Sequence, residues 1–390
     1  MADKPRFEGE RVKLRDVCTI VSGATPKTKT GEYWDGEIKW VTPAELDNDS
    51  HYISDTEKHL TEAGYKSAGL HMMPKGTVLL TTRAPIGKVA IAAEEMSCNQ
   101  GFKNLVCSSV VNNEFLYLYL KSRTAELQAM GRGATFKELS KKNVAGFEIN
   151  LPTIDRQLDA VAKLTAVGNQ IARAKQQHDQ LDTLVKSRFV EMFGDGCYPW
   201  CSLSSLSTTM QNGLSPSKAG VSYARVLTLS ALTRGGFDES AWKKGAFKEE
   251  PPLDKRVTGG CLYVCRGNGN RDLVGMAEFA PRSMRDLVFP DTMIEVGINQ
   301  EKVLPAYLAI AWKQRFAREQ IERFAKTTNG TYKINQKALG AIEIPIPPLA
   351  LQQQFADFVA QVDKSRFVVL NGKISRIQLI SRRIAHRYSR

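Results

Sequence analysis

The sequence predicts an α+β protein built from two similar mixed α/β domains, each followed by a long helix. Residues 154–193 and 349–388 carry apolar or small residues every three or four positions, which is typical of a helix that buries one narrow stripe. The two stretches correspond at a constant offset of 195 residues, as in Gln157 with Gln352 and Val185 with Ile380. A repeat of this length predicts a pseudo-symmetric molecule in which half of the chain is used twice.

The elements follow in order along the chain. In the first domain, short apolar runs at residues 38–41 and 77–80 predict strands bounded by turn residues, and residues 114–130 predict one helix. The glycines and proline of residues 194–199 end the first long helix. The predicted parts are therefore a first domain at 1–152, a helix at 153–193, a second domain at 194–347 and a helix at 348–390.

Each long helix needs a partner to cover its stripe. Roughly 40 residues make a rod about 60 Å long, which is far longer than an ordinary globular helix. The other long helix of the same chain is the natural partner, because its stripe is equally long. The residues expected to pack in this pair are Ile171, Leu181, Val185, Phe189, Val362, Val369, Ile380 and Ile384.

Within the two domains, short anchor sequences recur in the same order. The anchors are residues 22–26 with 212–216, the glycine-led strands Gly76–Arg83 and Gly260–Arg266, and Thr135–Lys137 with Thr331–Lys333. Between the anchors the halves diverge, for example at residues 60–73 and 242–255. Loops are where recognition usually lies, so this pattern predicts the same kind of contact made twice to two different targets.

The net charge indicates the chemistry of the partner. Lysine and arginine number 54 against 41 acidic residues, which gives a net charge of +13. A polyanion, above all nucleic acid, is the natural partner of such a chain, although the charge could serve solubility alone.

The composition also indicates the cellular compartment of the protein. No apolar run approaches 18 residues, and the polar first residues lack the apolar core of a signal peptide. Seven cysteines, an odd number, fit a reducing cytoplasm better than a disulfide framework. We therefore expect a cytoplasmic protein with no membrane partner.

Short sequence segments of this chain resemble those of the DNA-specificity subunit of type I restriction–modification enzymes, and their order is repeated in the two halves. The segments are Leu14–Val17 running into Ser22–Gly23, Trp40–Pro43, Leu80–Gly87, and Ile344–Pro348 running into Gln352–Gln353. The resemblance covers essentially the whole chain.

This resemblance implies a function and a set of partners. Each mixed domain would be a target recognition domain that reads one half of a split double-stranded DNA sequence, and the two helices would pack antiparallel as a coiled-coil spacer. Two methyltransferase (modification) subunits would bind alongside, and restriction (translocase and nuclease) subunits would join them in phage defence and DNA methylation. S-adenosylmethionine, ATP and Mg would belong to those partners, with no cofactor in this chain.

Catalytic and metal-binding patterns are weak in this sequence. It contains neither the Asn/Asp/Ser-Pro-Pro-aromatic motif of amino-methyl transfer nor a phosphate-binding loop. Asp291 and Glu295 imitate a nuclease carboxylate pair, but Gly297 stands where a lysine would be wanted. Cys261 and Cys265 lie about 13 Å apart if they end one strand, too far for a single tetrahedral ion. We therefore expect no catalytic residue and no metal site.

Candidate DNA contacts are basic and amide residues in loops, many of them beside glycines that would let backbone approach a phosphate. Arginine favours guanine and asparagine favours adenine, whereas any one of these residues could instead be a solvated surface charge. In the first half they are Lys27, Lys29, Arg83, Lys88, Arg132, Lys137, Lys141 and Lys142. In the second half they are Arg225, Arg266, Asn268, Asn270, Arg271, Arg323, Lys326, Asn329 and Lys333.

Two other classes of protein remain open at this point. A self-contained DNA methyltransferase would bind S-adenosylmethionine by itself. A coiled-coil adaptor would bind protein alone and show no salt-dependent affinity for DNA.

Overall fold

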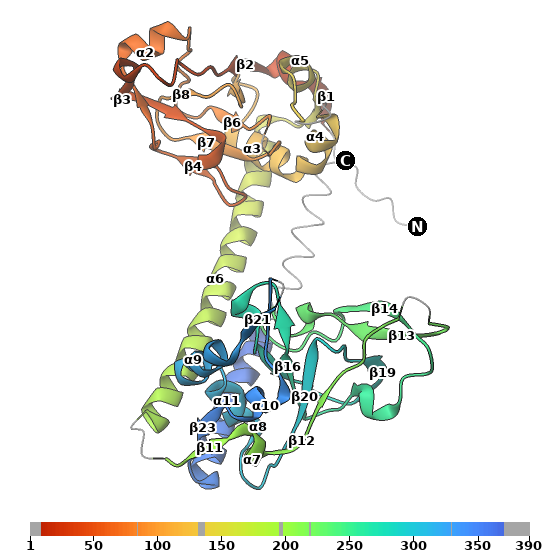
Figure 1. The fold of residues 1–390 in the computed structure, drawn as a ribbon. Coiled ribbons are helices and arrows are strands. Elements are labelled where there is room, and N and C mark those ends of the chain that lie inside the picture. The colour runs from red at the N-terminus through yellow and green to blue at the C-terminus, as the bar shows by residue number, and fades with distance from the viewer. Residues whose placement is uncertain are drawn as a thin grey trace. The chain divides into compact units, whose positions relative to one another are not determined.

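The computed structural model describes residues 9–83, 85–131, 137–194, 198–217, 220–328 and 330–369. The chain forms two compact units that divide between Lys175 and Gln176. This division lies inside helix α6, Ile154–Phe193, which Figure 1 shows as one continuous helix. Its bounds are those that the apolar periodicity predicts. Within the described ranges, no helix is long and apolar enough to cross a membrane.

The described residues of the first unit form ten strands with helices between them. Its strands are β1 (Glu10–Lys13), β2 (Cys18–Ser22), β3 (Trp34–Val41), β4 (Tyr52–Ile53), β5 (His59–Leu60), β6 (Val78–Leu80), β7 (Val89–Ala92), β8 (Ser97–Cys98), β9 (Lys103–Cys107) and β10 (Glu148–Leu151). Its helices before α6 are α1 (Leu14–Val17), α2 (Glu62–Ser67), α3 (Asn113–Ser122), α4 (Thr124–Met130) and α5 (Lys141–Ala145), with single 3-10 turns η1 (Gly31–Tyr33) and η2 (Pro43–Glu45).

The second unit continues from α6. Its strands are β11 (Trp200–Ser202), β12 (Ser207–Asn212), β13 (Ser222–Leu227), β14 (Trp242–Phe247), β15 (Arg256–Val257), β16 (Leu262–Cys265), β17 (Gly267–Asn268), β18 (Ala277–Phe279), β19 (Met284–Val288), β20 (Met293–Ile298), β21 (Lys326–Thr328), β22 (Thr331–Lys333) and β23 (Glu343–Pro345). Its helices are α7 (Leu203–Leu206), α8 (Pro305–Ala311), α9 (Arg315–Phe324), α10 (Gln336–Gly340) and α11 (Leu349–Val369), with 3-10 turns η3 (Leu229–Ala231), η4 (Leu253–Lys255) and η5 (Arg271–Leu273).

Sheet topology is repeated between the units. The order β2-β9-β6-β7 of the first unit recurs as β12-β20-β16-β18 in the second, and the pair β1-β10 recurs as β11-β23. A second sheet is mixed in both units, because β3 pairs parallel with β8 and β13 pairs parallel with β19. These correspondences confirm the predicted α+β fold with an internal repeat.

One predicted helix is in fact two. The stretch 114–130 breaks at Arg123, whose backbone (φ −105°, ψ 13°) leaves the helical region between α3 and α4. The bend allows the Thr124 hydroxyl to donate to the Gly87 carbonyl at 3.2 Å, and it buries Leu127 completely. The prediction of one helix is wrong because apolar periodicity does not register a tertiary contact of this kind. In the second unit the same break separates α8 from α9.

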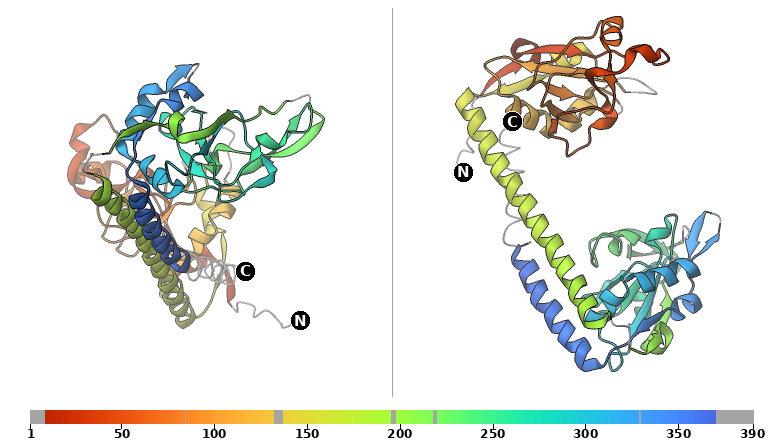
Figure 2. Two further views of the ribbon diagram at one scale, coloured as in Figure 1. Left: turned by 90° about the horizontal axis from the view of Figure 1, so that it is seen from below. Right: turned by 90° about the vertical axis from the view of Figure 1, so that its left-hand side faces the viewer.

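The two long helices pack against each other within the second unit, as both views of Figure 2 show. The rings of Phe189 in α6 and Phe355 in α11 lie 5.6 Å apart between centroids. Closer to the middle of α6, Asp182 accepts a hydrogen bond from Arg366 of α11. Contacts earlier in α6 therefore meet residues later in α11, so the described parts of the two helices run antiparallel.

The predicted packing residues have different outcomes. Val185, Phe189 and Val362 are buried in one core with the second unit's sheet and α8, and Leu181 packs against that core. Ile171 is half-buried. The side chain of Val369, and Ile380 and Ile384 as whole residues, lie outside the described part of the chain.

A buried glutamine fastens each long helix to its domain. The Gln157 amide donates to the carbonyls of Val110 (2.9 Å) and Pro152 (2.8 Å), and its oxygen accepts from the Asn112 N–H at 2.8 Å. Because all three partners are backbone groups, the start of α6 is hydrogen-bonded to the loop before α3.

Gln352 repeats this arrangement at the start of α11. Its amide donates to the carbonyls of Lys302 (3.2 Å) and Pro347 (2.8 Å), and its oxygen accepts from the Leu304 N–H at 2.8 Å. Gln157 and Gln352 are both fully buried, and these bonds satisfy the polar atoms of their side chains. We call these two residues the glutamine clamps.

Replacing Val185 by Asp should destabilise the second unit strongly, because Val185 is only 2% exposed and a charge there has no partner. The expected cost is about 3–5 kcal/mol, measured as a lower midpoint of thermal or denaturant unfolding. The matched control is Val190→Asp on the same helix, since Val190 is 58% exposed and should tolerate the charge. Equal midpoints for the two variants would show that the helices do not pair through this face.

The clamp in the second unit can be tested against its neighbour in the sequence. Gln352→Ala should cost about 1–3 kcal/mol, because it removes the buried bond to the Pro347 carbonyl and leaves the half-buried Leu304 N–H unpaired. Gln353→Ala is the control, because exposed Gln353 bonds only to Asp357 one turn away at 2.9 Å, and such pairs contribute about 0.2–0.5 kcal/mol. If both variants unfold at the same denaturant concentration, the clamp does not stabilise the unit.

Candidate nucleic-acid interface

In the first unit, the loops that carry the predicted contacts meet where two chain segments cross. Gly23 passes so close to the turn after β8 that a Cβ there would lie 2.1 Å from the Asn99 carbonyl oxygen. The next residues stay joined, because the Ala24 N–H donates to the Cys98 carbonyl at 3.1 Å. The Thr25 hydroxyl then donates to the side-chain oxygen of Gln100. Only glycine allows this approach, so the crossing fixes where the loop containing Lys27 and Lys29 begins.

The same turn holds two further loops. The Thr82 N–H donates to the Gly101 carbonyl at 2.7 Å, and the Thr82 carbonyl accepts from the Leu139 N–H at 2.9 Å. Arg83 and Lys141 follow closely in sequence after these bonded residues. Backbone hydrogen bonds therefore gather three loops from distant parts of the first domain.

Positive charge accumulates where these loops meet. Burial lowers the pKa of the Lys103 ammonium below its ordinary value, Glu138 partly offsets this, and the nearby cations Arg83 and Lys141 lower it further. Lys103 is half-buried and donates to the Phe102 carbonyl at 3.2 Å. Cations held close to one another in this way favour an anionic ligand, because an anion relieves their mutual repulsion.

The second unit repeats the crossing. A Cβ on Gly213 would lie 2.2 Å from the Phe289 carbonyl oxygen. The Arg266 N–H donates to the Thr292 carbonyl at 2.8 Å, and the Arg266 carbonyl accepts from the Ile334 N–H at 2.9 Å. These bonds correspond to those of Thr82 in the first unit, so the same backbone frame presents a different set of side chains.

These hydrogen bonds correct the alignment of the two halves that the sequence predicted. At two places the equivalent residues are shifted by one position. Thr82, and not Arg83, occupies the position of Arg266 in the backbone frame. Since Leu139 and Ile334 are also equivalent, Lys333 corresponds to Glu138 and not to Lys137. The anchor sequences of the two halves are similar, but the hydrogen bonds determine which residues of the two units are structurally equivalent.

A basic pocket of about 520 Å³ opens beside the second crossing. Four cations line it, and its described lining contains no acidic residue. The lining residues are Arg266, Phe324, Lys326, Lys333, Ile334, Asn335, Lys337, Ala338 and Ala341. Three of the predicted contacts therefore surround one cavity, and Lys337, which the sequence analysis missed, is the fourth cation.

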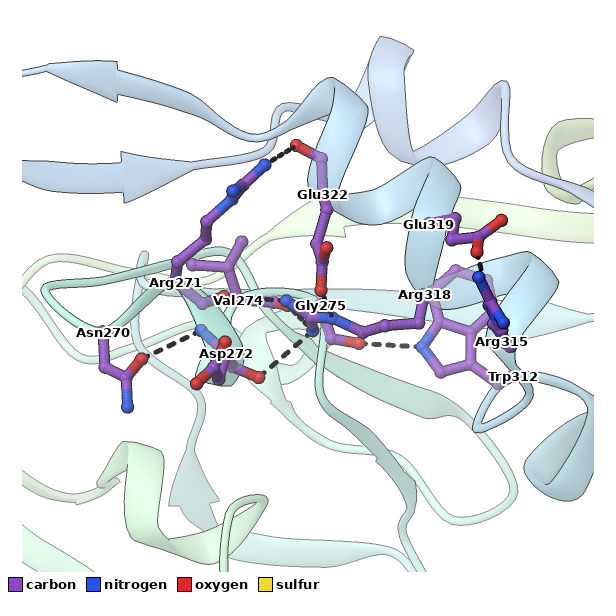
Figure 3. Close-up of polar contacts among 10 residues, drawn as sticks. All are labelled: Asn270, Arg271, Asp272, Val274, Gly275, Trp312, Arg315, Arg318, Glu319 and Glu322. Atoms are coloured by element: carbon purple, nitrogen blue, oxygen red, sulfur yellow. Dashed lines mark hydrogen bonds and ion pairs between the residues drawn. The ribbon is translucent and has the colours of Figure 1, made fainter.

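Residues 266–275, which we call the asparagine loop, are bonded to helix α9 by the contacts drawn in Figure 3. The Arg318 guanidinium donates to the carbonyls of Val274 (2.8 Å) and Arg271 (2.9 Å) and to the Glu322 carboxylate (2.7 Å). The hydrogen bond from Arg318 lowers the pKa of the Glu322 carboxyl below its ordinary value. Arg318 thus takes the place of water as the hydrogen-bond donor to several loop carbonyls, and these bonds fix the conformation of the loop.

A second anchor closes the asparagine loop. The indole N–H of Trp312 donates to the Gly275 carbonyl at 2.8 Å. Gly275 has a positive φ of +78°, and a Cβ there would lie 2.5 Å from the Ile321 side chain. A glycine is therefore required at this position on both conformational and steric grounds.

Several predicted contacts shape the loops themselves. The side-chain oxygens of Asn268 and Asn270 accept backbone N–H groups two residues ahead, each at 2.9 Å. The Arg271 guanidinium donates to the Glu322 carbonyl at 3.0 Å, which Figure 3 also draws. Lys88 donates to the Leu46 carbonyl. These four residues are partly committed to internal bonds.

The other predicted contacts fall into three groups. Arg83 and Arg266 are half-buried, and Arg266 donates to the Asp291 carbonyl at 3.2 Å. Arg225 pairs with Asp286 at 3.2 Å. Arg132 and Asn329 lie outside the described residues. The exposed cations are Lys27, Lys29, Lys137, Lys141, Lys142, Arg323, Lys326 and Lys333.

Gln100, Lys103 and Lys337 also lie in or beside these loops, although they were not predicted from the sequence. Gln100 and Lys103 flank Gly101, the residue whose carbonyl holds Thr82. Lys337 lies two residues after Asn335, whose side chain caps α10 by accepting from the Ala338 N–H. A glycine neighbour and a helix-capping asparagine were the available signals for these positions.

Comparison with known proteins identifies the family of this chain. The family model described as Type I restriction modification DNA specificity domain matches residues 8–183 and 284–379, which is more than half of the chain. The Type I restriction enzyme MjaIX specificity subunit of Methanocaldococcus jannaschii is 38% identical over 186 residues. That match covers 47% of this chain and 43% of the relative, so it spans less than half of the relative's length.

Two solved structures have a similar fold. The S subunit of a type I restriction–modification system from M. genitalium gives a TM-score of 0.58 at 12% identity, covering 100% of this chain and 98% of that one. A chain from a structural study of complex assembly and conformational transition of the type I R-M system also gives 0.58, at 16% identity and 99% coverage of each chain. The family match, together with the repeated fold, leads to one conclusion: this chain belongs to the type I restriction–modification DNA specificity domain family.

Proposed function

We propose that this chain recognises a bipartite double-stranded DNA sequence, with residues 1–152 and 194–347 as its two target recognition domains. The observation that carries the proposal is the repeated crossing at Gly23 and Gly213. One backbone frame presents loops at equivalent places in both units, whereas the side chains around it differ. Such a backbone frame suits a protein that recognises two different sequences on the same polymer.

Electrostatics support a nucleic acid as that polymer. The chain carries a net charge of +13, and part of it gathers around Lys103 and in the basic pocket. Lysines and arginines that neutralise phosphates release counterions, which gives affinity without sequence preference. Sequence preference would come from loop side chains at base edges, including those in the asparagine loop.

We further propose that the chain itself is non-catalytic. Two modification subunits and the restriction subunits would assemble with it and would bring S-adenosylmethionine, ATP and Mg. The family to which the chain belongs and the absence of a methyl-transfer motif from its sequence support this division.

The direct test is methylation profiling of a host that carries this chain with its modification subunits. A split methylated sequence that disappears when this chain is deleted would support the proposal. The purified chain should bind DNA in a salt-dependent manner and should not bind S-adenosylmethionine. Binding of S-adenosylmethionine by the chain alone would instead indicate a self-contained methyltransferase.

The basic pocket should contact phosphate and not bases. Lys333→Gln combined with Lys337→Gln should weaken binding to every duplex by a similar factor. The slope of log affinity against log salt should become shallower by about 0.9 for each phosphate that the variant no longer neutralises. Lys313→Gln is the control, because Lys313 already pairs with Glu278 at 2.7 Å. A weaker affinity confined to one DNA sequence would instead show that the pocket reads bases.

Each domain should determine its own half of the target. Exchanging residues 1–152 for the equivalent domain of a relative should change one half of the methylated sequence and leave the other half intact. Both glutamine clamps retain their partners in such a chimaera if the relative supplies the carbonyls and N–H that Gln157 uses. Simultaneous change of both halves would indicate one composite site.

A further inference from the structure

Strand β13 and its neighbour β14, the edge strand of their sheet, form an antiparallel ribbon with two unlike faces. Ala224, Val226 and Phe247 lie on one face and pack into a small apolar cluster. The opposite face carries Tyr223, Arg225, Trp242 and Lys244, all exposed, with Tyr223 at 62% and Trp242 at 40%. We call these four residues the ribbon ladder.

The register of the ribbon places two cations directly opposite each other. Arg225 pairs with Lys244, and like charges in that position destabilise a sheet. Each cation rests on an aromatic ring on its diagonal: the Arg225 guanidinium lies 4.5 Å from the Trp242 ring centroid, and the Lys244 ammonium lies 4.2 Å from that of Tyr223. The rings hold the cations in place while leaving their outer hydrogen-bond donors exposed.

The corresponding strand of the first unit is built differently. There β3 carries Trp34, which is half-buried against Trp40 and donates its indole N–H to the Lys27 carbonyl at 3.4 Å. The aromatic side chain is thus used for internal packing. One cation also lies near this ring, since the Lys58 ammonium is 5.7 Å from the Trp34 centroid. The described part of β3 therefore has a cation–ring contact, but one built on a packed ring and not on an exposed one.

Double-stranded DNA fits this surface better than a protein would. The major groove admits a two-stranded ribbon, and an arginine held flat can donate two parallel hydrogen bonds to guanine. Asp286 pairs with Arg225 at 3.2 Å while both side chains are more than half exposed, so a guanine edge could replace that carboxylate at small cost.

We propose that the ribbon ladder enters the major groove at the half-site recognised by the second unit, with Arg225 reading a base and Lys244 contacting a phosphate. Tyr223 and Trp242 are positioning residues that hold these two cations. This inference rests on the proposed DNA-recognition function and adds the element and residue that determine one half of the sequence.

The decisive variant is Arg225→Lys, which keeps the charge and removes the planar fork. Full-length chain assembled with its modification subunits would be tested against duplexes randomised in either half-site. We expect Arg225→Lys to lower discrimination at one base pair of the second half-site by about ten-fold or more, with the first half-site unchanged. Trp242→Ala should lower it in the same direction, and Trp242→Phe should restore most of it.

Neighbouring lysines provide the matched control. Lys243 and Lys244 are adjacent in β14, so strand alternation directs them to opposite faces. Lys244→Gln should weaken binding to all duplexes and make the salt slope shallower, whereas Lys243→Gln should change neither. An unchanged midpoint of thermal unfolding in every variant would show that the second unit remains folded.

Two outcomes would overturn the inference, and a third concerns the proposed function. If Arg225→Lys and Trp242→Ala keep full discrimination at both half-sites, the ribbon does not read DNA. If they lose assembly with the modification subunits and keep discrimination, the ladder is a protein contact. If the wild-type assembly itself shows no sequence preference in either half-site, the proposed function fails, whatever the ladder variants do.

Discussion

The glutamine clamps are the interaction on which the rest of this architecture depends. A helix of forty residues cannot bury its own stripe, so its orientation relative to a domain must be set where it begins. Gln157 and Gln352 do this with one amide group each, bonded to two carbonyls and one N–H of the adjoining domain. Because both glutamine side chains are fully buried, any other orientation would leave their amide groups without partners.

Beyond the clamps, a second constraint acts on the loops. Backbone crossings at Gly23 and Gly213 bring residues from distant parts of each domain together, and the bonds of Thr82 and Arg266 extend that frame to the segment before α5 and α10. These contacts are made by backbone atoms, so they impose glycine at the crossing and little elsewhere. The surrounding side chains are free to diverge, which is how one scaffold presents a cluster around Lys103 in one unit and a basic pocket in the other.

Electrostatic repulsion is tolerated at several of these places. The pKa of Lys103 is lowered by burial and by neighbouring cations, the basic pocket has four positive groups, and Arg225 faces Lys244 across the ribbon. Each arrangement costs stability in the free protein and would be relieved by a bound anion. Arg318 and Trp312 act in a different way. They fix the asparagine loop before a ligand binds, so less conformational entropy is lost on binding.

Much of the fold was determined by the sequence alone. Apolar spacing located α6 from Ile154 to Phe193, and the constant offset of 195 residues predicted the repeat, because helical periodicity and chain order are properties of the sequence itself. Residue type also selected cations that the structure leaves exposed, such as Lys27, Lys141 and Lys333. Tertiary structure decided which of them act together: the break at Arg123, the equivalence of Thr82 with Arg266, the role of Lys337 in the pocket and the opposition of Arg225 to Lys244. These features arise from strand register and from hydrogen bonds between segments far apart in the chain, and no local pattern records which segments will meet.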